Sequence, residues 1–374
     1  MNYRGKLFTY GGDIYDVKHS DSLFLQATKE NLAFHQANCP EYARILQQEN
    51  FSIDSLHSID DLYKIPPIPT LFFKSHALYS ISQKRLPVNV TSSGTQGKKS
   101  HVGFDKRTLY YALRMVLKTF AYHRLLSPVP TNYIVLGYEP SKRNQMSATK
   151  TAYGTTWLTP TLQREYALKD VGDRYELNIG GIKRALIRYS KIKLPVRFIG
   201  FPAYMKFLLD AMKEEELYLR LPKHSKVFLA GGWKQFFKEK VDKAELLLQI
   251  EEMLGITADN CKDFFGAVEH PIVYCDCKHH HFHVPVYSRV IIRDVESLLP
   301  VGNGKIGLLS LVSPLVGSVP LTHVITDDLA IMHEGKSCGC GMASPYFEII
   351  GRVGLQHIKT CAAGAAELLG RDSV

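Results

Sequence analysis

The chain has 374 residues, of which 45% are hydrophobic and 22% charged, and both shares are ordinary for a globular protein. A chain of this length is longer than a domain with a single hydrophobic core usually is, so we expect one large α/β domain with a small appendage, or two unequal domains. The formal net charge of +10 predicts attraction to phosphates or acidic partners, but no motif gathers the cations into a nucleic-acid-binding surface. No segment approaches the roughly 20 apolar residues of a membrane span. We therefore expect a cytoplasmic protein without a membrane span or a nucleic-acid partner.

The first third of the chain alternates helical and extended patterns. Apolar residues recur at helical spacing over 20–36, whereas the prolines of 65–70 force an extended connection. Val102 and Phe104 alternate as in a strand, and the apolar positions of 109–120 mark one face of an amphipathic helix. The order strand, loop, strand, helix differs from that of a Walker P-loop, in which the helix begins directly after the glycine-rich loop.

Strands and helices alternate through the middle of the chain, and strands dominate after Asp263. This alternation predicts an α/β sheet with helices packed on it. Residues 351–354 are typical of a hinge or linker, and a short alanine-rich helix is expected over 361–369. The predicted strands are 132–138, 196–199, 226–230, 289–293, 306–311 and 323–325, and the predicted helices are 203–212 and 240–254.

A loop rich in small residues and lysine precedes the strand at Val102. Residues 92–100 read Ser-Ser-Gly-Thr-Gln-Gly-Lys-Lys-Ser. Glycines expose backbone N–H groups, and the hydroxyls and lysines add donors and positive charge, which is what a polyphosphate site needs. A solvent-exposed turn accounts equally well for the loop taken alone.

Three segments farther along the chain favour nucleotide binding. Gly231-Gly232-Trp233-Lys234 ends a predicted strand, the segment from Phe264 to Glu269 ends another, and Thr326-Asp327-Asp328 lies beyond a third. Ligands bind at strand ends in open α/β sheets, so we expect all three segments at one crevice. An aromatic ring before glycine flanks a purine, a glutamate holds Mg²⁺, and an aspartate binds ribose hydroxyls. Each segment alone is more often a simple turn.

Cysteine and histidine residues form a second constellation. Two Cys-x-Cys pairs, at 275–277 and 338–340, accompany the histidines of 279–283. Zinc takes four such ligands tetrahedrally, and each cluster is compact enough to provide half of a site. The alternative is a group of unpaired buried thiols and surface histidines. A thiolate-rich set predicts a structural zinc, with the expected ligands Cys277, His283, Cys338 and Cys340, and Cys275 as a substitute.

Taken in order, these segments resemble the adenylate-forming superfamily that contains acyl- and aryl-coenzyme A ligases. The shared features are the Ser/Thr/Gly phosphate loop, the Gly-Gly turn, aromatic-Gly-x-x-Glu, Thr-x-Asp and Gly-Arg. Residues 92–98 and 338–341 are similar to phenylacetate-type coenzyme A ligases. A closer resemblance, over nearly the whole chain, is to the fatty-acid acyl-protein synthetases of bacterial bioluminescence. That resemblance is carried by residues 91–95, 99–101, 231–234, 326–328 and 359–361.

The resemblance implies an adenylate-forming core domain at 1–350, with mixed sheets packed by helices. It also implies that a short tail at 351–374 replaces the usual mobile C-terminal domain. A carboxylic acid, fatty or aryl, would attack the α-phosphate of ATP, and the acyl-adenylate would pass to a thiol. The superfamily loop usually ends Gly-x-Pro-Lys, so either Lys98 or Lys99 would act in this chain.

The implied roles can be assigned residue by residue. The loop would hold the β- and γ-phosphates, the Gly-Gly turn and Phe265 would frame the adenine, Glu269 would bind Mg²⁺, and Asp328 would bind the ribose. The complete implied nucleotide set is Ser92, Ser93, Gly94, Thr95, Gly97, Lys98, Lys99, Gly231, Gly232, Phe265, Gly266, Glu269, Asp328 and Arg352.

The tail carries the candidate acceptor thiol. In the acyl-protein synthetases the cysteine equivalent to Cys361 receives the acyl group, and a nearby cation and a helix N-terminus favour the thiolate that this transfer needs. Lys359 is the nearest candidate for the catalytic lysine that the missing domain supplies in other members. The alternative is a small buried cysteine that packs against alanines.

Three functions follow from these residues. The preferred one is an acyl-protein synthetase that uses ATP, Mg²⁺ and a structural Zn²⁺, acylates Cys361 and hands the acyl group to a partner such as a reductase. The second is a ligase whose acceptor is coenzyme A or a carrier protein. The third is an inactive, zinc-stabilised nucleotide-binding protein.

Overall fold

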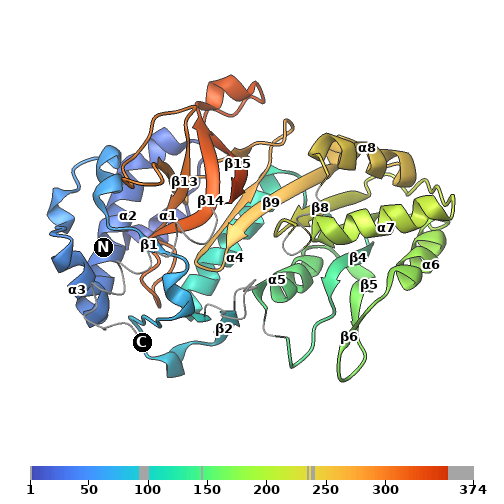
Figure 1. The fold of residues 1–374 in the computed structure, drawn as a ribbon, viewed down its shortest axis with the longest axis horizontal. Coiled ribbons are helices and arrows are strands. Elements are labelled where there is room, and N and C mark those ends of the chain that lie inside the picture. Colours follow the sequence, from blue (N-terminus) through green and yellow to red (C-terminus); the bar gives the residue numbers. More distant parts are fainter. Residues whose placement is uncertain (1, 92–100, 145, 234–235, 237–240, 353–374) are drawn as a thin grey trace. The chain divides into compact units, whose positions relative to one another are not determined.

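The computed structural model describes residues 2–91, 101–144, 146–233, 236 and 241–352. The chain divides into two compact units (Figure 1). The first unit comprises Met1–Tyr122 and Gly266–Val374, and the second unit is His123–Phe265. Within the described ranges, no helix combines the length and the apolar character that crossing a membrane requires.

The second unit is built on a mostly parallel sheet. Its strand order, β9-β8-β7-β4-β5-β6, differs from the order in the sequence, so crossover connections join its parallel strands. β4 pairs in parallel with β5 and β7, and seven of its eight residues are buried, as is typical of a strand covered on both faces. The strands are β4 (Thr131–Tyr138), β5 (Thr161–Asp170), β6 (Tyr175–Leu177), β7 (Val196–Gly200), β8 (Lys226–Ala230) and β9 (Cys261–Ala267).

Three helices of this unit, α6, α7 and α8, lie side by side and close an apolar core against the sheet (Figure 1). Phe198 of β7 and Met205 of α7 are fully buried in that core. α8 is defined at both ends, because Asp242 caps its first turn and Gly255 adopts a left-handed conformation after its last residue. The helices are α5 (Ser147–Thr155), α6 (Ile179–Ser190), α7 (Pro202–Glu214) and α8 (Lys243–Leu254).

Helices form the N-terminal part of the first unit. α2 begins after Asp16, whose carboxylate accepts a hydrogen bond from the backbone N–H of His19. α4 is amphipathic, and Tyr111 and Met115 lie on its buried face. The helices are α1 (Tyr3–Phe8), α2 (Val17–Asn38), α3 (Pro40–Gln48) and α4 (Lys106–Tyr122).

Antiparallel strands form the C-terminal part of the first unit. Their order is β11-β15-β14-β13-β12, and β1 adds in parallel beside β14. A separate hairpin pairs β2 with β3, from Val88 opposite Phe104 to Thr91 opposite His101. The described strands of the whole first unit are β1 (Ile68–Pro69), β2 (Val88–Thr91), β3 (His101–Phe104), β10 (His270–Cys275), β11 (Phe282–His283), β12 (Arg289–Arg293), β13 (Ile306–Val312), β14 (His323–His333) and β15 (Tyr346–Arg352).

The α/β class predicted from the sequence is confirmed, and two local predictions are wrong. Thr326-Asp327-Asp328 does not follow a strand, because β14 continues through these residues to His333. Gly351 and Arg352 do not begin a linker, because they pair with Leu329 and Asp328 and so complete β15. In both segments the strand is extended by backbone pairing between β14 and β15, which the pattern of side chains in the sequence does not show. The helix predicted at 361–369 lies outside the described residues, and the domain boundary predicted at residue 350 stays a prediction.

Candidate nucleotide and metal sites

The Gly-Gly turn lies at the carboxyl end of a parallel strand in the second unit. β8 ends at Ala230, and Gly231 and Gly232 follow with φ angles of 80° and 63°. Both angles lie in the left-handed region that side chains rarely adopt, so the backbone itself requires glycine. Trp233 then packs against the apolar core of the unit. The turn has the position that ligand-binding turns occupy in α/β sheets.

The aromatic-Gly-x-x-Glu segment follows in the chain. Phe265 and Gly266 are neighbours within β9, and the boundary between the units falls between them, so Gly266 and Glu269 belong to the first unit. A Cβ atom on Gly266 would stand 3.0 Å from the carbonyl oxygen of Ile272, so close backbone approach favours glycine there. Glu269 lies in the turn that follows β9, and its side chain is buried.

Asp328 and Arg352 form the best-defined part of the candidate nucleotide site. They face each other in the register of β14 and β15, and Arg352 Nε donates to Asp328 Oδ1 over 2.8 Å. Burial alone would lower the pKa of Arg352, but the carboxylates of Asp328 and Asp327 outweigh burial and raise that pKa. Asp328 is only 8% exposed, so the ion pair fixes a buried carboxylate in one orientation.

The remaining predicted nucleotide and catalytic residues lie outside the described residues. Among those that are described, the structure brings Asp328 and Arg352 into direct contact. Gly231, Gly232 and Phe265 belong to the second unit, and Gly266 and Glu269 to the first. The predicted residues outside the described ranges are Ser92, Ser93, Gly94, Thr95, Gly97, Lys98, Lys99, Lys359 and Cys361.

A cluster of cysteine and histidine side chains lies within the first unit. It consists of Cys277, His283, Cys338 and Cys340, whose ligand atoms all lie within 4.8 Å of one another. The Cys277 and Cys338 sulfurs are 3.6 Å apart, and Cys340 Sγ lies 3.2 Å from His283 Nε2. Zinc bonds of about 2.0–2.3 Å in a tetrahedron place neighbouring ligand atoms about 3.5 Å apart. The four side chains thus fit a zinc ion closely.

Local backbone structure explains why these four residues meet. The Cys277 N–H donates to the carbonyl oxygen of His281, which folds the chain back so that His283 enters β11 and pairs with Tyr346 of β15. A short helix, η8 (Gly335–Cys338), leads into the second cysteine pair. Gly339 and Gly341 have φ angles of 70° and 101°, so the alternation of cysteine with glycine reverses the chain around the cluster.

Hydrogen bonds orient the side chains of the cluster and favour the protonation states that bind a cation. His283 Nδ1 donates to the carbonyl oxygen of Ser344 over 2.8 Å, which leaves the Nε2 lone pair directed to the cluster. Burial alone would raise the pKa of Cys277, but contact with the His283 side chain and hydrogen bonds from the backbone N–H groups of His281 and His279 lower it and favour the thiolate. A thiolate beside a neutral imidazole is the donor set that zinc prefers.

The sequence analysis included the histidines around the cluster but gave them no role. His281 Nδ1 lies 3.2 Å from Cys338 Sγ, and His279 Nδ1 donates to the Cys338 carbonyl oxygen over 2.6 Å. The run of histidines at 279–281 was the available signal for this outer layer. Cys275 lies outside the cluster, and its thiol donates to the carbonyl oxygen of Asp276 over 3.6 Å. The geometry therefore favours Cys277 over Cys275.

The fold is that of the adenylate-forming ligases. A 2-hydroxyisobutyryl-CoA ligase, solved with 2-HIB-AMP and CoA in the thioesterification state, has a TM-score of 0.66 at 14% identity, over 91% of this chain and 69% of the other. An open conformation of that ligase, also with 2-HIB-AMP and CoA, has a TM-score of 0.65 at 14% identity, with coverages of 89% and 69%. At this identity the likeness establishes the fold alone.

Sequence relatives define the protein more narrowly. The family model described as acyl-protein synthetase, LuxE, matches residues 15–369, and the chain belongs to this family. A long-chain-fatty-acid–luciferin-component ligase of Aliivibrio fischeri is 26% identical over 351 residues, which cover 92% of this chain and 88% of the relative. Its counterpart in Vibrio harveyi is 23% identical over 356 residues, with coverages of 94% and 90%. The chain is a ligase that activates an acid as an acyl-adenylate and transfers it to a thiol, as the sequence predicts.

Proposed function

We propose that this ligase activates a long-chain fatty acid with ATP and transfers the acyl group to Cys361 of its own chain. The family match over residues 15–369 carries the proposal, because it spans both the nucleotide-binding segments and Cys361. Both relatives named above are long-chain-fatty-acid ligases, which supports this class of acid. A reductase is the proposed partner that takes the acyl group from the enzyme.

The described residues supply part of the adenylation chemistry. Asp328, held by Arg352, accepts hydrogen bonds from the ribose hydroxyls, and the turn at Gly231 and Gly232 lies against the adenine. Residues 92–99 bind the β- and γ-phosphates. The acid's carboxylate oxygen attacks the α-phosphorus, the bond to the bridging oxygen breaks, and pyrophosphate leaves. Glu269 would hold a Mg²⁺ ion, which would supply positive charge to the phosphates.

The second half-reaction moves the acyl group to sulfur. The Cys361 thiolate attacks the acyl carbon, a thioester bond forms, and AMP leaves with the electrons of the broken acyl–phosphate bond. Lys359 favours the thiolate through its charge and interacts with the departing phosphate. Coenzyme A or a carrier protein is the alternative acceptor.

Two measurements on the purified protein test this function. Exchange of labelled pyrophosphate into ATP, dependent on a long-chain fatty acid, reports adenylation, and labelled fatty acid retained on the denatured protein reports acyl transfer. We expect Cys361→Ser to keep the exchange and to lose the label. Cys39→Ser is the matched control, because burial raises the pKa of Cys39 and keeps its thiol protonated, so this variant should retain both activities.

Three outcomes contradict the proposal. Label on Cys361→Ser would place the acyl group elsewhere on the chain. Release of acyl-coenzyme A with no acyl-protein would favour the coenzyme A ligase. Binding of ATP without exchange for fatty, aryl or amino acids would identify an inactive nucleotide-binding protein.

We also propose that the cluster at Cys277, His283, Cys338 and Cys340 holds a structural Zn²⁺. The separation of its ligand atoms and the His283 tautomer support the metal, and three thiolates with one imidazole complete a tetrahedral sphere without an open position. The described cysteines are thiols and not disulfides, which supports a reducing compartment such as the cytoplasm.

Metal analysis tests the zinc proposal separately from activity. We expect one zinc ion per chain in the purified protein and less than one tenth of that in Cys340→Ser. Cys275→Ser is the matched control and should retain the metal, because Cys275 lies outside the cluster. Equal zinc contents in the two variants, or no zinc in the wild type, would contradict the assignment.

A further inference from the structure

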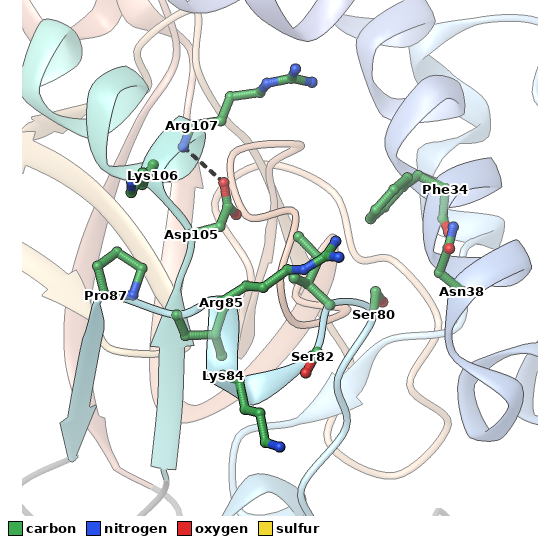
Figure 2. Close-up of a pocket in the computed structure, with 12 residues that line it drawn as sticks. Phe34, Asn38, Ser80, Ser82, Lys84, Arg85, Pro87, Asp105, Lys106 and Arg107 are labelled. Atoms are coloured by element: carbon green, nitrogen blue, oxygen red, sulfur yellow. Dashed lines mark hydrogen bonds between the residues drawn. The ribbon is translucent and has the colours of Figure 1, made fainter.

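A pocket with a volume of about 780 Å³ lies in the first unit (Figure 2). It is lined by the short helix η4 (Gln83–Arg85), by the start of α4, and by Phe34 and Asn38 of α2. Leu86 and Asp105, which flank the paired ends Val88 and Phe104 of the β2–β3 hairpin, also line it. None of the described lining residues belongs to the predicted nucleotide set.

Positive charge dominates the rim of this pocket. Lys84, Arg85, Lys106 and Arg107 all line it, their side chains are exposed, and no ion pair found within the described residues involves them. The single carboxylate of the described lining, Asp105, caps α4: its Oδ1 accepts from the N–H groups of Arg107 and Thr108, over 2.9 and 3.0 Å. The four cations are therefore available to an anion, and the first N–H groups of α4 are already satisfied.

The pocket is also lined by Ser80, whose hydroxyl proton is already used in a hydrogen bond to His35. His35 is fully buried, and burial lowers its pKa to about 3, so its ring is neutral. Its Nε2 lies 3.1 Å from the carbonyl oxygen of Val316 and must donate, which makes Nδ1 an acceptor. Ser80 Oγ, 2.7 Å from Nδ1, therefore donates to His35. Ser80 is 92% buried and lines the pocket, so its oxygen faces a ligand only as an acceptor.

From this geometry we propose that the pocket binds a phosphorylated small molecule that carries a free hydroxyl, such as a sugar phosphate. Arg85, whose guanidinium extends toward the Ser80 side of the pocket (Figure 2), binds the phosphate, and the other three cations of the rim add positive charge. Ser80 Oγ accepts a hydrogen bond from the hydroxyl. The volume lies within the usual range for small-molecule sites, roughly 300–1,000 Å³, and Phe34 supplies an apolar wall. The proposal does not depend on the acyl-protein synthetase function.

Ribose 5-phosphate is the first probe, with binding measured calorimetrically on the full chain. We expect it to bind more tightly than inorganic phosphate, to weaken as salt rises, and to bind far better than ribose. The double variant Arg85→Gln/Lys106→Gln should weaken binding at least about tenfold, because it removes half of the rim charge. Lys193→Gln/Lys213→Gln is the matched control, with the same loss of charge at exposed positions of the second unit, and should leave binding unchanged.

Ser80→Ala tests the hydroxyl contact. It should weaken ribose 5-phosphate about fivefold and leave inorganic phosphate unchanged, as expected for one hydrogen bond. If the loss of a partner for His35 prevents this variant from folding, the preference of the wild type for ribose 5-phosphate over inorganic phosphate decides the same point. Equal binding by the two double variants would overturn the proposal. Loss of binding in Asp328→Asn would also overturn it, because the ligand would then belong to the nucleotide site. Binding of hexaglutamate in place of ribose 5-phosphate would overturn it as well and would indicate a surface for an acidic protein.

Discussion

The two units of this chain have interiors of different chemistry. The core that α6, α7 and α8 close in the second unit is mainly apolar, with Phe198 and Met205 fully buried in it, although the unit also buries Arg197 and Asn132. Among its described residues, the first unit buries four histidines: His283 in the Cys/His cluster, and His35, His270 and His323 outside it. The stability lost on truncating a side chain in an apolar core grows with the volume removed. The stability of a polar interior depends on each hydrogen-bond or metal-binding partner being present.

The buried histidines of the first unit are bound into short hydrogen-bond networks. His270 Nε2 lies 3.0 Å from Tyr274 Oη, which lies 2.6 Å from Ser288 Oγ. His323 Nδ1 donates to the Ile65 carbonyl oxygen over 2.8 Å, and Nε2 lies 2.6 Å from Ser310 Oγ. The His323–Ile65 contact joins segments 258 positions apart, whereas the His270 network lies within residues 270–288. Burial favours the neutral form of both rings. The stability of this unit should therefore respond to metal and to pH, and that of the second unit to volume.

Metal removal should have the largest effect on this comparison. Structural zinc contributes about 10–16 kcal/mol of binding free energy in small zinc-binding peptides, so we expect Cys338→Ser to destabilise the first unit by on the order of 5 kcal/mol or more. Hydrogen exchange followed by mass spectrometry should show protection lost over 270–352 and kept over 196–254. Equal loss in both ranges would mean that the units do not differ in this way, and no loss would deny the cluster a structural role.

A core truncation should produce the opposite pattern. Phe198→Ala removes a fully buried ring from β7 and should lower the free energy of unfolding of the second unit by about 3–5 kcal/mol. Leu248→Ala on α8 is the control, because Leu248 is 68% exposed and its truncation should change stability by less than about 0.5 kcal/mol. Chemical denaturation with the same exchange measurement checks both values. A larger loss of protection over 270–352 than over 196–254 would contradict the assignment.

The same contrast explains what the sequence could predict. Strands such as 132–138 and 226–230 were predicted within one residue, because continuous apolar runs between turn signals specify buried parallel strands. The four metal-cluster residues were predicted because Cys-x-Cys spacing limits the candidates. The Ser80–His35 pair was not, since these residues are 45 positions apart and neither is unusual in its local sequence. The course of β14 through Asp328 depends on pairing with β15, which no local pattern encodes.

Acid should destabilise the first unit more than the second. Burial lowers the pKa of His35 and of His270 to about 3 and the pKa of His323 well below 6.5. The charge of Arg4 lowers the pKa of His35 further, whereas Asp105 raises it. The charge of Arg293 lowers the pKa of His323 further. Because the unfolded chain binds these protons near pH 6.5, the contribution is full above that pH and is lost as pH falls toward the folded-state values.

Between pH 7 and pH 5.5 the loss should be about 1 kcal/mol per buried histidine, or about 3 kcal/mol for the three. The second unit is the internal control, because neither of its histidines, His123 and His224, is buried. Exchange protection measured at both pH values, with zinc content checked at each, separates this effect from metal loss. Parallel losses in the two units would show that the buried histidines are not its source.

Loss of a helix cap should have the smallest effect and should stay within the second unit. Asp242 accepts a hydrogen bond from the N–H of Ala244 over 2.8 Å at the start of α8. Asp242→Ala should lower the free energy of unfolding by about 1 kcal/mol, while Asp242→Asn, which keeps the acceptor, should lose only a few tenths. Asp173→Ala, at a side chain that is 79% exposed, is the control for loss of a surface carboxylate. If Asp242→Asn were as destabilising as Asp242→Ala, the charge at the start of α8, and not the hydrogen bond, would stabilise this helix.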